Sequence, residues 1–133
     1  MAFVLDASLA VGWVVARQAT TYSRGIRLRA RREPYHAPAL WRLEVVNALR
    51  SLERRRTMAA DAAEVAVDIL ERMRPNFHEA AMPCADLLRL ARKFDLSAYD
   101  ANYLALALDL RLPIACSDGA LRSVLARAGV KLA

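Results

Sequence analysis

The segment from Leu96 to Leu110, LSAYDANYLALALDL, constrains the fold of this chain more than any other stretch. Alanine and leucine are strong helix formers and Ser97 is a favourable N-cap, so the segment predicts a helix from about Ala98. One face of this helix carries an apolar stripe made of Tyr99, Tyr103, Leu106, Ala107 and Leu110. Leu104 and Leu108 lie on other faces. A helix that is apolar on nearly all sides is usually buried, so we expect it in the core.

Asp100 is the exception within this apolar helix, because its carboxylate falls in the first turn. An unpaired charge is costly in a buried place, so Asp100 requires a cation or a hydrogen-bonding partner. One interpretation is a capping box with Ser97, since a serine N-cap followed three residues later by an acid is a known helix start, although Glu is usual there. The other interpretation is a functional site to which other segments also contribute.

The composition is that of an ordered globular protein. The 133 residues are 56% hydrophobic and 26% charged, with only four Gly and five Pro, and they predict a single domain over residues 1–133 with a sizeable core. Cys84 and Cys116 have no metal-binding or redox spacing, so we expect two reduced core thiols. Asp6 interrupts the first apolar run, and the run after it is too short to span a bilayer. We therefore expect a cytoplasmic protein without a secretory signal or membrane segment.

The positive charge is concentrated in the first half of the chain. The formal net charge is +6, from 18 Arg and two Lys against 14 acidic residues. Residues 1–58 hold 11 basic and four acidic side chains, whereas residues 59–133 hold nine and ten. Arginine binds phosphate through two parallel hydrogen bonds, so this distribution predicts affinity for a polyanion such as RNA. A solvated helix face or a docking site for an acidic protein are the alternatives.

Short apolar runs alternate with amphipathic helical segments along the chain. The runs that predict strands are residues 3–5, 35–37, 77–81, 113–116 and 130–132. The segments that predict helices are residues 7–15, 20–32, 40–56, 61–73, 84–94, 98–110 and a last one ending at 127. This alternation predicts an α/β fold with a short, mostly parallel sheet covered by helices on both faces.

Four acidic residues are expected at one edge of that sheet. Asp6 ends the first strand, Asp118 follows the strand at 113–116, and Asp100 and Glu44 lie in the first turns of their helices. Strand ends of a parallel sheet share one edge, where ligands bind, so the four carboxylates should converge. Like charges repel at short range unless a cation holds them together. Oxygen ligands without a nearby His or Cys favour Mg²⁺ or Mn²⁺ over Zn²⁺.

Each acid also has an ordinary structural interpretation when it is taken alone. Asp6 is well placed to cap a helix, and Asp118 before Gly119 is typical of a turn or cap. Glu44 borders the apolar stripe of its helix and is equally compatible with a solvated position. The convergence of all four, rather than any single residue, favours a site.

Four segments resemble the successive motifs of the PIN domain. They are VLDAS (Val4 to Ser8), LEVVNAL (Leu43 to Leu49), LSAYDANYLALA (Leu96 to Ala107) and CSDGAL (Cys116 to Leu121). More narrowly, they are similar to the VapC-type toxins of toxin–antitoxin modules, in order and spacing, over residues 3–132. The resemblance implies a Mg²⁺-dependent ribonuclease with a three-layer α/β/α sandwich, usually a homodimer, inhibited by a cognate antitoxin.

The resemblance also assigns roles to residues. The family's acidic quartet falls on Asp6, Glu44, Asp100 and Asp118, of which we expect the three aspartates to be the main metal ligands. Glu44 is then a further ligand or positions the attacking water, and the arginine-rich first half holds the RNA backbone. The expected products carry 5′-phosphate and 3′-hydroxyl groups.

The chain departs from the family pattern at one position in this set. Cys116 stands where Thr is common, two residues before the last acid. Residues i and i+2 of a strand face the same side, so Ser117 cannot replace that hydroxyl. The hydrogen bond that would orient Asp6 or Asp118 is therefore not predicted from this position. Ser8 matches the small polar residue that often follows the first Asp.

Three other functions remain open at this stage. A signalling receiver domain also has an acidic Mg²⁺ pocket, but it needs a lysine beside the pocket, and neither Lys93 nor Lys131 is so placed. A non-catalytic module of the same fold would bind RNA or protein through the basic face. A related nuclease would process RNA outside a toxin–antitoxin module, or act on structured RNA or DNA. No histidine is needed as a base, so we expect His36 and His78 to be structural or surface residues.

Overall fold

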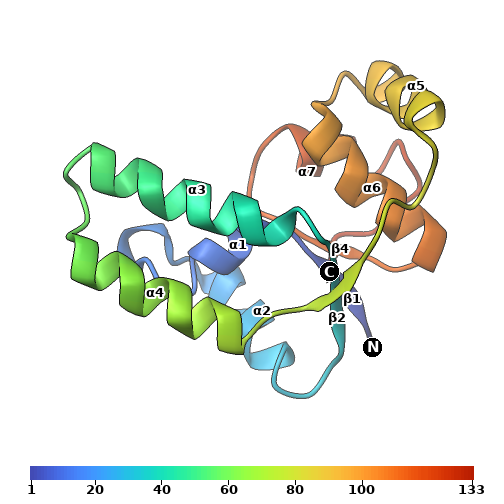
Figure 1. Ribbon diagram of the computed structural model, residues 1–133. Helices are drawn as coiled ribbons and strands as arrows, with labels where there is room; N and C mark the ends of the chain where they lie inside the picture. Colours follow the sequence, from blue (N-terminus) through green and yellow to red (C-terminus); the bar gives the residue numbers. More distant parts are fainter.

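The computed structural model describes residues 1–133, in which strands and helices alternate (Figure 1). The strands are β1 (Phe3–Leu5), β2 (Tyr35–Pro38), β3 (Asn76–His78) and β4 (Ile114–Ala115). The helices are α1 (Ala7–Val11), the 3-10 helix η1 (Ala16–Gln18), α2 (Thr21–Arg29), α3 (Trp41–Arg54), α4 (Ala60–Arg72), α5 (Cys84–Phe94), α6 (Ala98–Leu110) and α7 (Ala120–Val124). The helices predicted over 84–94 and 98–110 are confirmed at both ends.

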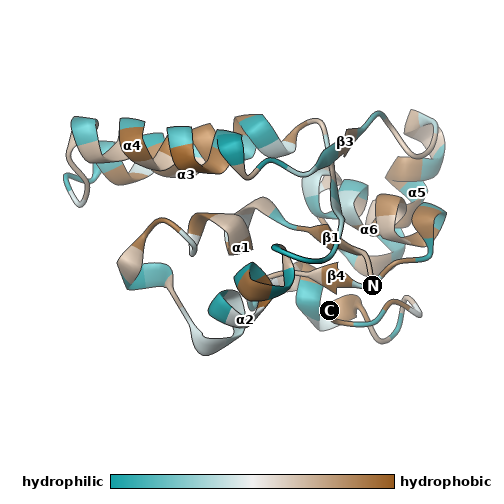
Figure 2. Ribbon diagram, turned by 90° about the horizontal axis from the view of Figure 1, so that it is seen from below, coloured by the Kyte–Doolittle hydropathy of each residue, from teal (hydrophilic) through white to brown (hydrophobic).

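The four strands form one parallel sheet in the order β3-β2-β1-β4. β1 is an inner strand, and its residues Phe3 to Leu5 are completely buried. Val4 pairs with His36 of β2 on one side and with Ile114 of β4 on the other. Helices α1 to α4 lie on one side of the sheet, and α5, α6 and α7 lie on the other (Figures 1 and 2). The predicted α/β/α sandwich with a parallel sheet is confirmed.

Helix α6 contributes more buried residues than any other helix of the structure. Its buried residues are Ala101, Tyr103, Leu104, Ala105, Leu106 and Ala107. It packs on β1, β2 and β4, and its other sides contact α5 and α7, which explains why it is apolar nearly all round. Two of its large side chains depart from this pattern, because Tyr99 is 63% exposed and Leu108 is 39% exposed.

The helix predicted over residues 7–15 is too long, since α1 ends at Val11. The chain turns after Gly12 so that the backbone of Gln18 comes close to it. A Cβ atom on Gly12 would lie 3.0 Å from the carbonyl oxygen of Gln18 and 3.2 Å from that of Leu9. A close backbone contact of this kind favours glycine, and it bends the chain from α1 toward η1.

Besides the strand at 113–116, which keeps only Ile114 and Ala115, two predicted strands are shorter than expected. The strand at 77–81 ends at His78, because its partner β2 ends at Pro38, the residue that pairs with His78. The strand at 130–132 is reduced to a single bridge between Leu132 and Ile114. Both segments lie at the margins of the sheet, where pairing ends with the partner strand.

The expectation of two core thiols is correct for Cys116 and wrong for Cys84. Both cysteines are free, but Cys84 is exposed because it begins α5, of which only Phe94 is buried. His36 and His78 are partly buried and pair with each other across β2 and β3, with 2.9 Å between Nδ1 and Nε2. They are structural, as predicted. None of the helices has the length and apolar character that crossing a membrane requires.

Two glycine-to-alanine substitutions test the close contact at Gly12. Gly12→Ala should destabilise the protein by about 1–2 kcal/mol, because the added methyl group displaces backbone atoms. Gly25→Ala is the matched control, since Gly25 lies within α2 and a Cβ there meets nothing within 4 Å. The control should stabilise the protein by about 0.5–1 kcal/mol. Urea denaturation measures both, and equal stability of the two variants would contradict the role given to Gly12.

Candidate functional site

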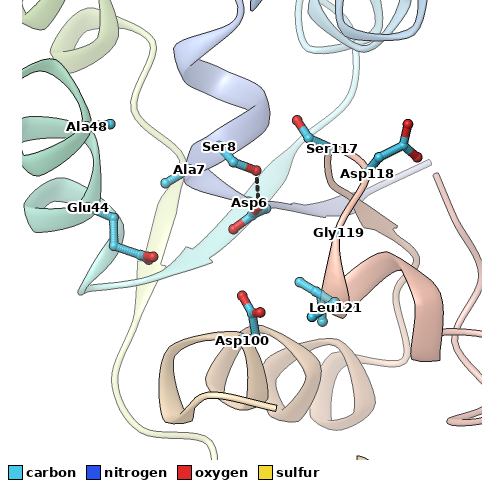
Figure 3. A pocket seen from close by; sticks show the side chains of 11 residues that line it. Asp6, Ala7, Ser8, Glu44, Ala48, Asp100, Ser117, Asp118, Gly119 and Leu121 are labelled. Atoms are coloured by element: carbon cyan, nitrogen blue, oxygen red, sulfur yellow. Dashed lines mark hydrogen bonds between the residues drawn. The ribbon is translucent and has the colours of Figure 1, made fainter. Parts of the chain in front are cut away.

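A pocket of about 270 Å³ opens at the edge of the sheet where β1 and β4 end. All four predicted acids, Asp6, Glu44, Asp100 and Asp118, belong to its lining (Figure 3). They come from the end of β1, from α3, from α6 and from the loop between β4 and α7. The convergence that the sequence predicts is therefore present at the level of the lining residues, although the four side chains do not all point the same way.

Asp6 is the most buried of the four acids, with 8% of its surface exposed. Its N–H donates to the carbonyl oxygen of Ala115 at 2.9 Å, which fixes the residue beside β4. Its carboxylate accepts a hydrogen bond from the Ser8 hydroxyl, and the residue stands at the N-cap of α1. Burial raises the pKa of Asp6 to about 6, the Ser8 hydrogen bond partly offsets this, and the charge of Asp100 adds to it. Asp6 therefore occupies the N-cap position of α1 and also belongs to the lining of the pocket.

Glu44 projects from the first turn of α3 toward the same space (Figure 3). Its Oε1 accepts a hydrogen bond of 2.7 Å from the hydroxyl of Tyr103 in α6. Burial raises the pKa of Glu44 to about 7, the Tyr103 hydrogen bond opposes the rise, and the charges of Asp6 and Asp100 add to it. Glu44 is thus a partly buried carboxylate held by a second element of the fold, and the solvated interpretation is wrong.

Asp100 enters the pocket from the first turn of α6. The Ser97 hydroxyl accepts a hydrogen bond of 3.1 Å from the backbone N–H of Asp100, so Ser97 caps the helix as predicted. The Asp100 carboxylate has no hydrogen bond or salt bridge of its own, and it points toward Asp6 and Glu44 (Figure 3). Burial raises its pKa. The backbone N–H of Asp100 thus belongs to the helix cap, and its carboxylate belongs to the pocket.

Asp118 is the acid that the structure does not bring together with the others. Its side chain is 95% exposed and points away from Asp6, Glu44 and Asp100 (Figure 3). One carboxylate oxygen accepts a hydrogen bond of 2.9 Å from Nη1 of Arg122, four residues later in α7. The backbone around Asp118 lines the pocket, but its charge is directed outward.

The donors of the pocket suit a hard divalent cation. Three carboxylates face one space without a basic side chain in the lining, and their mutual repulsion contributes to the raised pKa values of Asp6 and Glu44. No three His, Cys, Asp or Glu side chains lie close enough to hold one metal ion jointly. Mg²⁺ usually keeps several waters and binds proteins through one or two carboxylates, so the residues fit a hydrated ion better than a closed cage.

Cys116 adds no hydroxyl group to the site, as the sequence predicts. Its thiol is buried, and burial, followed by the charge of Asp6, raises its pKa to about 12, so it stays neutral. Neither Cys116 nor Ser117 hydrogen-bonds to an acid of the pocket. Asp6 receives its orienting hydrogen bond from Ser8 instead.

Sequence reasoning missed two residues of the site, Tyr103 and Arg122. Tyr103 was assigned only to the apolar stripe of α6, yet a buried tyrosine hydroxyl needs a partner, and Asp100 three residues earlier marks that side of the helix. Arg122 stands four residues after Asp118, which is the spacing of helical ion pairs. Both signals were present in the sequence.

Some arginines of residues 1–58 bind other groups of the protein, and the rest are unpaired at the surface, which we call the open basic surface. Arg27, Arg29, Arg42 and Arg50 bind other groups of the protein. The arginines that make no side-chain hydrogen bond or ion pair are Arg17, Arg24, Arg31, Arg32, Arg54, Arg55 and Arg56. Arg17 and Arg55 line one small pocket, so η1 and the end of α3 meet there. This end of α3 lies roughly 16 Å along the helix from Glu44.

Comparisons with known proteins support the fold alone. No protein-family model matches the chain, and no curated protein matches it in sequence. Among solved structures, the chain is similar to the crystal structure of PAE2754 from Pyrobaculum aerophilum, with a TM-score of 0.64 and 20% identity. The match covers 97% of this chain and 90% of that chain. A likeness at this identity extends to the arrangement of strands and helices and not to the chemistry of the pocket.

The raised pKa of Asp6 predicts how stability depends on pH in the metal-free protein. Folded Asp6 keeps its proton up to about pH 6, whereas the unfolded chain releases it near 3.8. The stability that the protonated carboxyl contributes is complete below pH 3.8 and is lost as the pH rises through 6. Asp6→Asn should therefore be more stable than wild type by about 1–3 kcal/mol at pH 8 and equally stable at pH 3.5.

Urea denaturation in EDTA at the two pH values measures this difference. Asp109→Asn, at the exposed far end of α6, is the control and should show no such pH-dependent gain. If Asp6→Asn is no more stable than wild type at pH 8, burial does not raise the pKa of the Asp6 carboxyl.

Proposed function

We propose that this protein is a Mg²⁺-dependent endoribonuclease, the toxin of a type II toxin–antitoxin module. The observation that carries the proposal is the convergence of the Asp6, Glu44 and Asp100 carboxylates from three separate elements on one pocket. The motif resemblance to VapC-type PIN domains assigns the acids of the catalytic centre to these positions. A receiver domain is less well supported, because neither lysine of the chain lines the pocket.

Each acid has a role in the proposed hydrolysis. A bound Mg²⁺ or Mn²⁺ supplies a water of lowered pKa and offsets negative charge at the phosphate. Asp6 and Asp100 would hold the ion directly or through water, and Asp118 would add a third ligand only after its side chain turns from Arg122 toward the pocket. Glu44, whose pKa is about 7, is suited to take a proton from the attacking water near neutral pH while the Tyr103 hydroxyl holds it in place.

The proposed reaction is a simple hydrolysis. The water oxygen bonds to phosphorus, the bond from phosphorus to the 3′-oxygen breaks, and that oxygen takes up a proton. The products carry a 5′-phosphate and a 3′-hydroxyl group. The unpaired arginines near α2 and at the end of α3 would bind the RNA backbone at a distance from the cut, because guanidinium groups pair well with phosphates.

Two protein partners belong to the same proposal. An apolar groove beside the pocket contains Leu43, Val46 and Tyr99, which are 75%, 51% and 63% exposed. Exposed apolar patches mark protein contacts, so we infer that a second copy of the chain covers this groove in a homodimer. The second partner is a cognate antitoxin, and a small reading frame directly upstream of the gene would support it.

RNA cleavage tests the catalytic proposal. Wild-type protein should cleave single-stranded RNA with Mg²⁺ or Mn²⁺ and stop when EDTA is added. Asp100→Asn should lower the rate at least 100-fold, because the pocket loses one of its inward carboxylates. The control Asp109→Asn changes a carboxylate at the other end of the same helix and should cleave normally. Cleavage that persists in EDTA, or equal rates for Asp100→Asn and wild type, would refute the proposal.

Sedimentation velocity tests the homodimer. Wild type should sediment as a dimer, and Leu43→Lys should sediment as a monomer, because a charge would be buried in the apolar contact. Val65→Lys is the control, since Val65 is 59% exposed on α4 and lies outside the groove. A monomeric wild type, or a dimeric Leu43→Lys variant, would count against this interface.

A further inference from the structure

The ion pair between Asp118 and Arg122 separates one acid from the other three. Asp118 follows β4 at the rim of the pocket, and the residues on both sides of it, Ser117 and Gly119, also line the pocket. Its carboxylate nevertheless accepts a hydrogen bond of 2.9 Å from Arg122 and points outward (Figure 3). The charge of Asp118 lies outside the pocket because its side chain points outward, although its backbone lies at the rim.

Arg122 has a second contact besides Asp118. Its side chain is only 27% exposed, and its guanidinium lies 4.8 Å from the centre of the Tyr22 ring. The Tyr22 hydroxyl in turn donates to an oxygen of Ala133 at 3.2 Å, which ties α2 to the end of the chain. A guanidinium stacked on an aromatic ring loses mobility, so it presents a fixed donor to its partner.

We propose that Arg122 is a positioning residue that holds the Asp118 carboxylate outside the pocket until a divalent cation competes for it. The inference rests on the metal site of the proposed function. The Asp118 side chain is 95% exposed, so other staggered positions are open to it without a change in the backbone, and a cation would bind the one that faces the pocket. The cation therefore gains a ligand only by breaking the ion pair.

Competition between Arg122 and a cation predicts the direction in which a change at Arg122 alters cation affinity. Because Arg122 binds the same carboxylate as the cation, removing Arg122 should strengthen cation binding, and the gain should require Asp118. Exposed ion pairs are weak, so the gain should be about two- to fivefold in affinity. If Arg122 instead acts only through its positive charge at a distance, the gain should persist without Asp118.

Mn²⁺ binding to the full-length protein, followed by the electron paramagnetic resonance signal of free Mn²⁺, tests this proposal. The set contains wild type, Arg122→Gln, Asp118→Asn and the double variant. Arg122→Gln should bind Mn²⁺ about two- to fivefold more tightly than wild type. Asp118→Asn should bind it more weakly, and the double variant should match Asp118→Asn.

Two further variants separate charge and folding from the proposed contact. Arg127→Gln removes a charge from the segment after α7, where its guanidinium lies over the Phe94 ring, and it should leave Mn²⁺ affinity unchanged. Arg122→Lys keeps the cation and should restore affinity toward wild type. Circular dichroism checks that each variant is folded.

Failure of the role of Arg122 and failure of the metal site would give different results. An equal gain in the presence and absence of Asp118, or no gain for Arg122→Gln when it is folded, would overturn the role of Arg122 while leaving the metal site in place. A wild-type protein that binds no Mn²⁺ at all would overturn the metal site of the proposed function, and the role of Arg122 with it.

Discussion

The burial of the Asp6 carboxylate is the constraint on which the rest of the structure depends. Asp6 ends the fully buried strand β1, and its position is fixed by the backbone bond to Ala115 of the neighbouring strand. A carboxylate removed from water is unfavourable unless polar groups surround it. The fold supplies one hydroxyl, from Ser8, and then adds the two further acids Glu44 and Asp100. The fold thus brings three carboxylates together at the buried end of its inner strand.

The charges of the chain are separated along α3. Glu44 in its first turn faces the acidic pocket, whereas Arg54 and Arg55 at its far end belong to the open basic surface. An elongated polyanion is attracted to the basic end and repelled at the acidic end. A cation in the pocket would reverse the repulsion there, so the proposed substrate could cross both regions only when the pocket is loaded.

Sequence patterns predicted the fold and the lining of the site more fully than its side-chain directions. The residues of α6 encode both its length and its burial, because Ser97 caps it and apolar side chains occupy almost every face. The end of α1 was not predictable from periodicity, because it depends on the close contact between the backbones of Gly12 and Gln18. Asp118 is paired with Arg122 of α7, and strand spacing carries no information on this contact.

The pairing of β1 with β4 also determines the order in which the protein can be completed. Val4 and Ile114 are neighbours in the sheet although they lie at opposite ends of the chain. A polypeptide leaving the ribosome exposes β1 long before β4 is synthesised, so β1 waits with one edge unpaired. Pairing between such distant segments is also slow. The acidic pocket, whose lining includes Ser117 to Leu121, is therefore assembled only after the segment that follows β4 has been synthesised.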